Sequence, residues 1–221
     1  MPHSTGDSFT NWLQGQWGRR TPWQILLLPP AALFFFISLV RRLLFRSGLR
    51  RSHRLPVPVI VVGNLTVGGT GKTPLVLWLV EFLRSQGYHP GIISRGYAGS
   101  AAQPQAVSAV SDPALVGDEP LLLARRTQCP IWVGRRRADV ARALLVAHPD
   151  CDVIISDDGL QHYALQRDVE VVVVDGVRRF GNGLPLPAGP LREPLSRLQS
   201  VDAVVVNGGT ADVGEYGMRL V

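Results

Sequence analysis

The residues of this sequence best suited to chemistry lie in one glycine-rich segment that contains its only lysine. The segment spans residues 63–74 and reads GNLTVGGTGKTP. An apolar run at 57–62 precedes it, and a stretch typical of a helix follows. Glycines let backbone N–H groups close on phosphate oxygens, and the first turn of a helix adds positive potential there. The segment therefore predicts a loop that binds the phosphates of a nucleotide.

Individual residues of this predicted phosphate loop have distinct chemical tasks. Lys72 supplies a point charge to the outer phosphates, and the Thr73 hydroxyl is placed to ligate Mg²⁺. The common form of the motif has glycine at position 66, where this chain has threonine. A glycine-rich turn without a ligand is the alternative, but such a turn has no use for the only lysine. The residues predicted to contact the nucleotide are Thr66, Val67, Gly68, Gly69, Thr70, Gly71, Lys72 and Thr73.

Two further sites supply carboxylates. An apolar run at 153–156 ends in Asp157 and Asp158, and a carboxylate at the carboxyl end of a strand can help hold Mg²⁺ beside phosphates. Alone this sequence is more often a turn; beside a phosphate loop it predicts a metal site, and we favour Asp157 as the ligand. The second site, Asp118 with Glu119, is compatible with an ordinary helix start. Because phosphoryl transfer needs a carboxylate that orients or deprotonates the attacking hydroxyl, Asp118 is a candidate base.

The elements that must position these residues alternate along the chain from residue 57. Near-continuous Val and Ile runs are typical of buried parallel strands, and helical stretches separate them. The alternation predicts an α/β fold with a P-loop and a doubly wound, mostly parallel sheet. The expected strands are 57–62, 91–94, 153–156, 169–174 and 203–206, and the expected helices are 73–85, 119–126 and 138–147. Residues 98–113 and 178–198 are predicted to be long loops, which are usually functional in a compact domain.

The first quarter of the chain has a different composition, so we divide the sequence into three parts. Residues 1–22 are predicted to be a loosely ordered polar leader, and residues 55–221 the nucleotide-binding domain. Between them, residues 23–54 are predicted to form a membrane-associated helix and its basic flank. No charge occurs at 23–40, and the expected helix, 31–45, begins after two prolines. An all-helical run of that length spans roughly 27 Å, barely a hydrocarbon core, so spanning and interfacial placements both stay open.

The net charge of +6 and the pI near 10.1 invite a nucleic-acid interpretation, but the position of the charges argues against it. Residues 1–56 hold eight arginines and one acidic residue, a formal +7, whereas residues 57–221 hold 15 basic and 16 acidic residues. The excess therefore lies beside the apolar helix, where arginines meet anionic lipid headgroups. We expect an anionic membrane surface as a partner and no nucleic acid.

Several short motifs occur together in the order found in one family. The chain resembles the tetraacyldisaccharide 4′-kinases, the lipid A biosynthetic kinases of Gram-negative bacteria, over about residues 20–210. The motifs that carry the resemblance are the phosphate loop, Ser94-Arg95-Gly96-Tyr97, Val116-Gly117-Asp118-Glu119-Pro120, Asp157-Asp158-Gly159-Leu160-Gln161-His162, Val174-Asp175-Gly176 and Leu191-Arg192-Glu193-Pro194. The Gly-Asp-Glu-Pro and Asp-Asp-Gly-Leu-Gln-His segments are close to diagnostic.

The resemblance implies an activity and a place for it. A family member transfers the γ-phosphate of ATP, with Mg²⁺, to the 4′-hydroxyl of a tetraacyl-disaccharide 1-phosphate at the cytoplasmic face of the inner membrane. Asp118 matches the catalytic base, and Lys72 and Thr73 match the phosphate and Mg²⁺ residues. Further matches near the site are Glu119, Arg137, Asp157, Asp158, Gln161, His162, Arg192 and Glu193. The family continues beyond residue 221 into a second lobe with a histidine that pairs with the base, so we expect that lobe to be absent here.

Two alternatives stay open at this stage. The first is a membrane-tethered P-loop ATPase that acts through partners, which would have the same phosphate loop and the same apolar N-terminal helix. A GTP-dependent switch protein is excluded, because its guanine-binding motif Asn-Lys-x-Asp needs a lysine other than Lys72. No protein partner is otherwise inferred.

The second alternative concerns three arginines of the long 178–198 loop. They are either solvated or placed to bind the 1-phosphate of the lipid: Arg178, Arg179 and Arg192.

Overall fold

An eight-stranded sheet organises the protein, as seen in a computed structural model that describes residues 15–19, 21–96, 99 and 103–219. The strand order is β3-β4-β2-β5-β1-β6-β7-β8, and each neighbouring pair is parallel except β3 with β4. The strands are β1 (Val59–Gly63), β2 (Pro90–Ser94), β3 (Gln105–Val107), β4 (Ile131–Val133), β5 (Val153–Asp157), β6 (Val169–Asp175), β7 (Ala203–Asn207) and β8 (Tyr216–Met218). The prediction of an α/β, mostly parallel sheet is confirmed.

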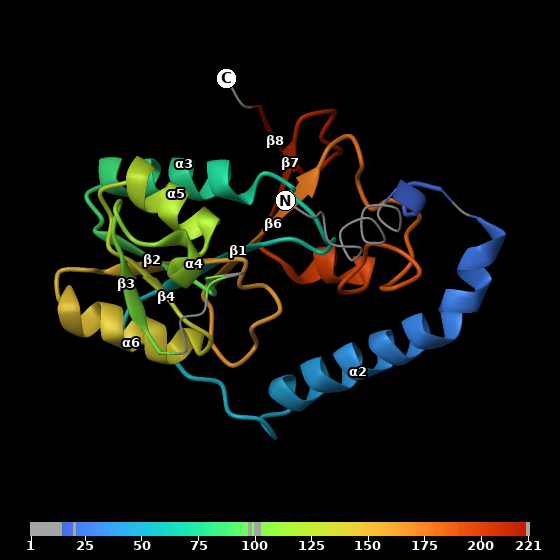
Figure 1. Cartoon of the computed structure of the whole chain (residues 1–221), viewed down its shortest axis with the longest axis horizontal. Coiled ribbons are helices and arrows are strands. Elements are labelled where there is room, and N and C mark those ends of the chain that lie inside the picture. The colour runs from blue at the N-terminus through green and yellow to red at the C-terminus, as the bar shows by residue number, and fades with distance from the viewer. Residues whose placement is uncertain (1–14, 20, 97–98, 100–102, 220–221) are drawn as a thin grey trace.

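Helices cover both faces of the sheet, so the strands are buried on both sides. On one face α3 (Lys72–Ser85) and α5 (Asp118–Arg126) pack through residues such as Val76 and Leu123. On the other, α6 (Arg137–Ala147) packs through residues such as Leu144 (Figure 1). Burial on both faces explains why the central strands read as continuous Val and Ile runs.

The five strands and three helices expected from the sequence are present, with ends shifted by at most two residues. Shorter elements were not predicted. Two of them, α4 (Pro113–Val116) and the short strand β3, lie in or at the end of the segment expected to be the 98–113 loop. A 3₁₀ helix, η2 (Leu195–Ser200), closes the second long loop. Elements of three to six residues carry too little periodicity to stand out in a sequence.

The N-terminal apolar segment forms a 3₁₀ turn, η1 (Pro22–Leu27), followed by the long helix α2 (Leu28–Arg46). Pro29 and Pro30 lie in the first turn of α2, where proline is tolerated, so the helix begins before them rather than after. Figure 1 shows α2 at the edge of the molecule, on the side of the sheet that α6 covers. The stretch 22–46 is long and apolar enough to cross a membrane, and only 11% of its most apolar window is buried.

Part of the predicted polar leader packs against the domain. Trp17 is buried, its indole N–H donates to the carbonyl of Pro187 (3.1 Å), and its own carbonyl accepts from the N–H of Asn182 (2.7 Å). This differs from the loose leader expected from composition, because an isolated tryptophan among polar residues gives no sign of its distant partner. Residues 1–14 of the predicted leader lie outside the described residues.

Candidate functional site

The phosphate loop connects β1 to α3 at the carboxyl edge of the sheet, as the sequence predicts. Its backbone takes positive φ angles at Gly68 (+99°) and Gly71 (+90°), which favour glycine. Position 66 has no such requirement: Thr66 is buried and forms a bridge to Leu191. The loop therefore keeps its fold with threonine where the common motif has glycine.

Two side chains hydrogen-bond to backbone carbonyls of the loop segment, one from the loop itself and one from the segment after β5. The Asn64 side chain donates from Nδ2 to the carbonyl of Gly68 (3.2 Å). Gln161 donates from Nε2 to the carbonyl of Asn64 (3.1 Å). Gln161 is predicted near the nucleotide, and in the structure its side chain is hydrogen-bonded to the start of the phosphate loop.

Lys72, the first residue of α3, lies beside Asp158. Its Nζ atom is 3.6 Å from Asp158 Oδ1, and Arg192 Nη1 is 3.4 Å from the same oxygen. Burial alone would raise the pKa of Asp158, but the positive charges of Lys72, Arg192 and Arg137 outweigh it, and the pKa is lowered from its usual value. The predicted Lys72, Asp158 and Arg192 therefore form one cluster, with a carboxylate that stays ionised.

Asp157, at the end of β5, is the most deeply buried carboxylate of this group. Ser94 Oγ lies 3.5 Å from its Oδ2, while its Oδ1 is buried without a hydrogen-bond partner. Burial raises the pKa of Asp157 to about 6; the Glu119 carboxylate adds to the rise, and Arg137 and Lys72 oppose it. An unpartnered buried carboxylate oxygen next to a phosphate loop is a suitable ligand for a cation.

Arg137 lies beneath the carboxylates and is fully buried. Its guanidinium donates to the carbonyls of Ile93 (3.2 Å), Asp157 (2.9 Å) and Asp158 (3.2 Å). Burial lowers the pKa of Arg137 to about 10, so it stays charged at neutral pH. Arg137 thus holds together the carboxyl ends of β2 and β5.

The predicted base and its neighbour begin α5. Asp118 is exposed as the first residue of the helix, directly after Gly117, whose φ is +89°. Glu119 lines a cavity of ≈ 340 Å³ together with Asp158. Asp118 is not one of the lining residues; it is exposed and directly precedes Glu119 in the chain.

This cavity lies between α2 and the carboxyl ends of β2 and β5, so it joins the apolar helix to the charged cluster. The helix contributes an aromatic ring, a hydroxyl and a cation, and the loop before η2 adds an apolar side chain. The lining residues are Phe34, Ser38, Arg41, Ser94, Arg95, Glu119, Asp158, Gln161, Leu186 and Arg192. The contribution of α2 was not predicted, because no local pattern shows which face of an apolar helix turns to a domain.

Two predicted residues have other surroundings. Burial, with Arg137 and Arg167 nearby, lowers the pKa of His162 to about 4, so the ring is neutral at physiological pH. Glu193 is buried away from the Lys72 cluster: it accepts from the Tyr163 hydroxyl (2.7 Å) and lies 3.4 Å from Arg197 Nε. Glu193 therefore belongs to a buried group with Tyr163 and Arg197, whereas its neighbour Arg192 belongs to the Lys72 cluster.

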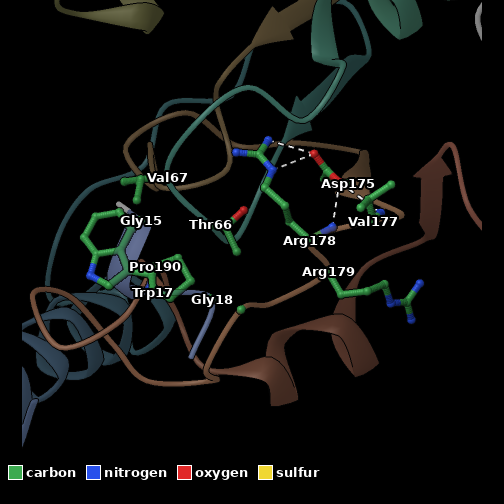
Figure 2. A pocket seen from close by; sticks show the side chains of 11 residues that line it. Gly15, Trp17, Gly18, Thr66, Val67, Asp175, Val177, Arg178, Arg179 and Pro190 are labelled. Carbon is green, nitrogen blue, oxygen red and sulfur yellow. Dashed lines mark hydrogen bonds and ion pairs between the residues drawn. The ribbon is translucent and has the colours of Figure 1, made fainter. Parts of the chain in front are cut away.

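A second cavity, of ≈ 490 Å³, has two residues of the phosphate loop in its wall (Figure 2). Thr66 and Val67 line it with Trp17, Arg178 and Pro190. In Figure 2 the side chains of Arg178 and Asp175 face each other, while that of Arg179 points away from them. Arg179 pairs with Asp212 and Glu215, and Arg178 with Asp175, so both arginines already have carboxylate partners.

The donor set fits Mg²⁺ rather than a metal held by protein alone. No group of three or more His, Cys, Asp or Glu side chains suited to a metal is found among the described residues. Mg²⁺ is usually held by one or two carboxylates together with phosphates and water. Asp157, with its unpartnered Oδ1, and Thr73, in the first turn of α3, meet that requirement.

Comparisons with known proteins agree with this geometry. A relative from Methylobacillus flagellatus, named tetraacyldisaccharide 4′-kinase, is 56% identical over 216 residues, covering 98% of this chain and 64% of the relative. One of the same name from Nitrosococcus oceani is 59% identical over 203 residues, covering 91% and 60%. The chain thus spans less than two thirds of the length of these relatives. The structure of LpxK from Aquifex aeolicus in complex with ATP superposes with a TM-score of 0.79 at 32% identity, covering 89% of this chain and 64% of that one.

The family model described as tetraacyldisaccharide-1-P 4′-kinase matches residues 23–219, which include the helix, the phosphate loop and each carboxylate motif. The resemblance recognised from the sequence motifs is confirmed. The chain belongs to the tetraacyldisaccharide-1-P 4′-kinase family.

Proposed function

We propose that this protein binds ATP with Mg²⁺ and transfers the γ-phosphate to the 4′-hydroxyl of a tetraacyl-disaccharide 1-phosphate. The observation that carries the proposal is the cavity that joins α2 to the Lys72, Asp158 and Arg192 cluster. Family membership and the ATP complex of the Aquifex aeolicus relative support the nucleotide. The cavity gives one site both an apolar helix for a lipid and a charged edge for phosphoryl transfer.

In this proposal the phosphates of ATP lie on the N–H groups of residues 66–73, with Lys72 near the outer phosphates. Asp157 and Thr73 hold Mg²⁺, which when bound neutralises charge on the phosphate oxygens. Lys72 and Arg192, which both lie beside Asp158, keep its carboxylate ionised. These residues are proposed to position the γ-phosphate at the cavity between α2 and the carboxyl ends of β2 and β5.

The acceptor is proposed to enter from the α2 side of the cavity. Its hydroxyl oxygen attacks the γ-phosphorus, the bond from that phosphorus to the bridging oxygen breaks, and ADP leaves. The hydroxyl proton passes to the carboxylate of Asp118, which is exposed and directly precedes the cavity-lining Glu119. Arg41 and Arg95 line the cavity and supply positive charge for the sugar phosphate.

Membrane attachment is part of the proposal. Helix α2 exposes large apolar side chains, among them Leu33, Phe36 and Ile37, while Arg42 reaches Ser200 of η2. This arrangement supports docking of the apolar helix at the cytoplasmic face of the inner membrane, with Arg46 in its last turn available to anionic headgroups.

The test is whether nucleotide consumption requires the lipid. Purified protein in detergent micelles should convert γ-labelled ATP to labelled lipid only when the tetraacyl-disaccharide 1-phosphate and Mg²⁺ are both present. Asp118→Asn should lose transfer while binding ATP as the wild type does. Hydrolysis of ATP that ignores the lipid and responds to a protein partner would overturn the proposal in favour of a tethered ATPase.

A further inference from the structure

Two side chains hold the phosphate loop from outside, and neither belongs to the residues predicted to contact the nucleotide. The guanidinium of Arg178 donates from Nη2 to the carbonyl of Gly69. The side chain of Asn207 donates from Nδ2 to the carbonyl of Thr70 (3.3 Å). Two consecutive carbonyls of the loop are therefore tied to the domain by side chains from outside the loop.

Asn207 is the last residue of a strand, and Arg178 lies in the turn that follows the neighbouring strand. Asp175 ends β6 and Asn207 ends β7, and the two residues are register partners in the sheet. The Asp175 carboxylate accepts from the backbone N–H groups of Val177 (3.0 Å) and Arg178 (2.8 Å) and from Arg178 Nε (2.8 Å). Arg178 is thus fixed by a short turn at the end of a buried strand before it reaches the loop.

Two glycines of the loop leave room for the side chains of Arg178 and Asn207. A Cβ atom on Gly71 would lie 2.2 Å from Asn207 Nδ2, and one on Gly68 would lie 3.3 Å from Arg178 Nη1. Gly71 also has a φ of +90°. Glycine at position 71 is therefore required both by its backbone conformation and by the side chain of Asn207.

Because the peptide bond is planar, a contact that fixes a carbonyl of the loop also fixes the direction of the following N–H group. In a trans peptide the C=O of one residue and the N–H of the next point in opposite directions. Holding the carbonyl of Gly69 outward turns the N–H of Thr70 inward, and holding the carbonyl of Thr70 outward does the same for the N–H of Gly71. These N–H groups belong to the loop that the proposed function assigns to phosphate oxygens.

We propose that Arg178 and Asn207 are positioning residues that preset the N–H groups of Thr70 and Gly71 for phosphate binding. The inference rests on the proposed function, because it assumes that the loop binds a polyphosphate. Arg178 also places a positive charge behind the loop. The guanidinium of Arg178 contacts Asp175 and the Gly69 carbonyl, so we assign it to the phosphate loop and not to the 1-phosphate of a lipid.

The experiment compares binding of Mg²⁺-ATP and of inorganic triphosphate, which has no base or ribose, by calorimetry on the full chain. The variants are Arg178→Gln and Asn207→Ala. The matched control is Arg179→Gln, which removes the same charge from the adjacent position while its partners are Asp212 and Glu215. Arg178→Lys is a further variant, and melting temperatures of all five proteins, the wild type included, show whether each variant folds.

Arg178→Gln should weaken both ligands about tenfold or more, the size expected for a lost hydrogen bond with a charged donor. Asn207→Ala should weaken both about fivefold, since its donor is neutral. Arg178→Lys should recover part of the affinity by restoring the charge. Arg179→Gln should bind both ligands as the wild type does.

Unchanged triphosphate affinity in both folded variants would overturn the inference. So would a loss confined to ATP, because it would mean contact with the nucleoside rather than control of the loop. A wild type that binds both ligands but transfers no phosphate would defeat the proposed function and leave this inference standing. A wild type that binds neither ligand would overturn both.

Discussion

The Nζ atom of Lys72 lies 3.6 Å from Oδ1 of Asp158, so the only lysine of the chain is anchored at the carboxyl edge of the sheet by the motif that follows β5. Arg192 reaches the same oxygen at 3.4 Å. The three residues come from α3, from the end of β5 and from the long loop before η2. This convergence connects the phosphate loop to the edge where the acceptor is proposed to bind.

Replacing Lys72 tests that connection. Lys72→Met should reduce kcat/KM for ATP by about a hundredfold or more, because the variant loses a cation that stabilises charge on the transferred phosphoryl group. Lys72→Arg should recover little, since a planar guanidinium does not reproduce the position of an ammonium group. Steady-state transfer assays measure both, and near wild-type turnover in Lys72→Met would contradict the assignment.

The raised pKa of Asp157 predicts a pH dependence of activity. Burial raises this pKa to about 6, and a carboxylate binds Mg²⁺ only when it is deprotonated. The value of kcat/KM should therefore rise with pH through an apparent pKa near 6, since this parameter reports the free enzyme. A profile that stays flat between pH 5 and pH 7 would show that Asp157 is not the essential group.

The same group predicts a pH dependence of stability with a defined sign. The folded pKa lies above the usual 3.8, so the folded state binds the proton more tightly, and the free energy of unfolding falls as pH rises from about 4 to about 6. His162 acts in the opposite direction, because its pKa is lowered from 6.5 to about 4 and stability is lost as pH falls through that window. Asp157→Asn should remove the opposing contribution, so that stability rises more steeply with pH than in the wild type, measurable by urea denaturation across this pH range. The same slope in variant and wild type would refute the assignment.

Arg137 is predicted to support the site without touching phosphate. Arg137→Ala removes the guanidinium that donates to three carbonyls and takes a cation from two carboxylates, so it should lower the free energy of unfolding by about 3–5 kcal/mol. Chemical denaturation measures the loss. An Arg137→Ala variant with wild-type stability but no ATP binding would instead make this arginine a phosphate ligand.

Arg192 and Glu193 should respond differently although they are adjacent in the sequence. Arg192→Gln removes a partner of Asp158 and should lower activity with little change in melting temperature. Glu193→Gln disturbs the buried contacts with Tyr163 and Arg197 and should lower the melting temperature. Equal melting temperatures together with equal losses of activity would contradict this division.

The exposed face of α2 is predicted to bind lipid. Phe36→Asp should reduce flotation of the protein with anionic vesicles, because it replaces a large apolar side chain that is 61% exposed with a charge. Trp78→Asp on α3 is the matched control, since Trp78 is similarly exposed (55%) on the opposite face of the sheet. Equal losses in the two variants would argue against α2 as the docking element.

Local sequence patterns predicted the central fold but not the contacts between distant segments. Continuous apolar runs revealed β1, β2, β5, β6 and β7 because buried parallel strands need such runs, whereas β3, β4 and β8 are only three residues long. The phosphate loop was recognisable because its glycines and Lys72 are contiguous.

The role of Asn207 could not be predicted, because it depends on β7 ending beside a loop 137 positions earlier in the chain. The burial of Trp17 depends in the same way on a distant loop. Glu193 was grouped with Arg192 by adjacency, but side-chain direction assigns the two residues to different partners.

The central claim is tested most directly by the product of a single turnover. Wild-type protein with Mg²⁺-ATP and tetraacyl-disaccharide 1-phosphate should yield a bisphosphorylated lipid whose new phosphate is on the 4′-oxygen, identified by phosphorus NMR. An acceptor that lacks the 4′-hydroxyl should yield none. Labelled inorganic phosphate at equal rates with both acceptors, and no new phosphorylated lipid, would contradict the account.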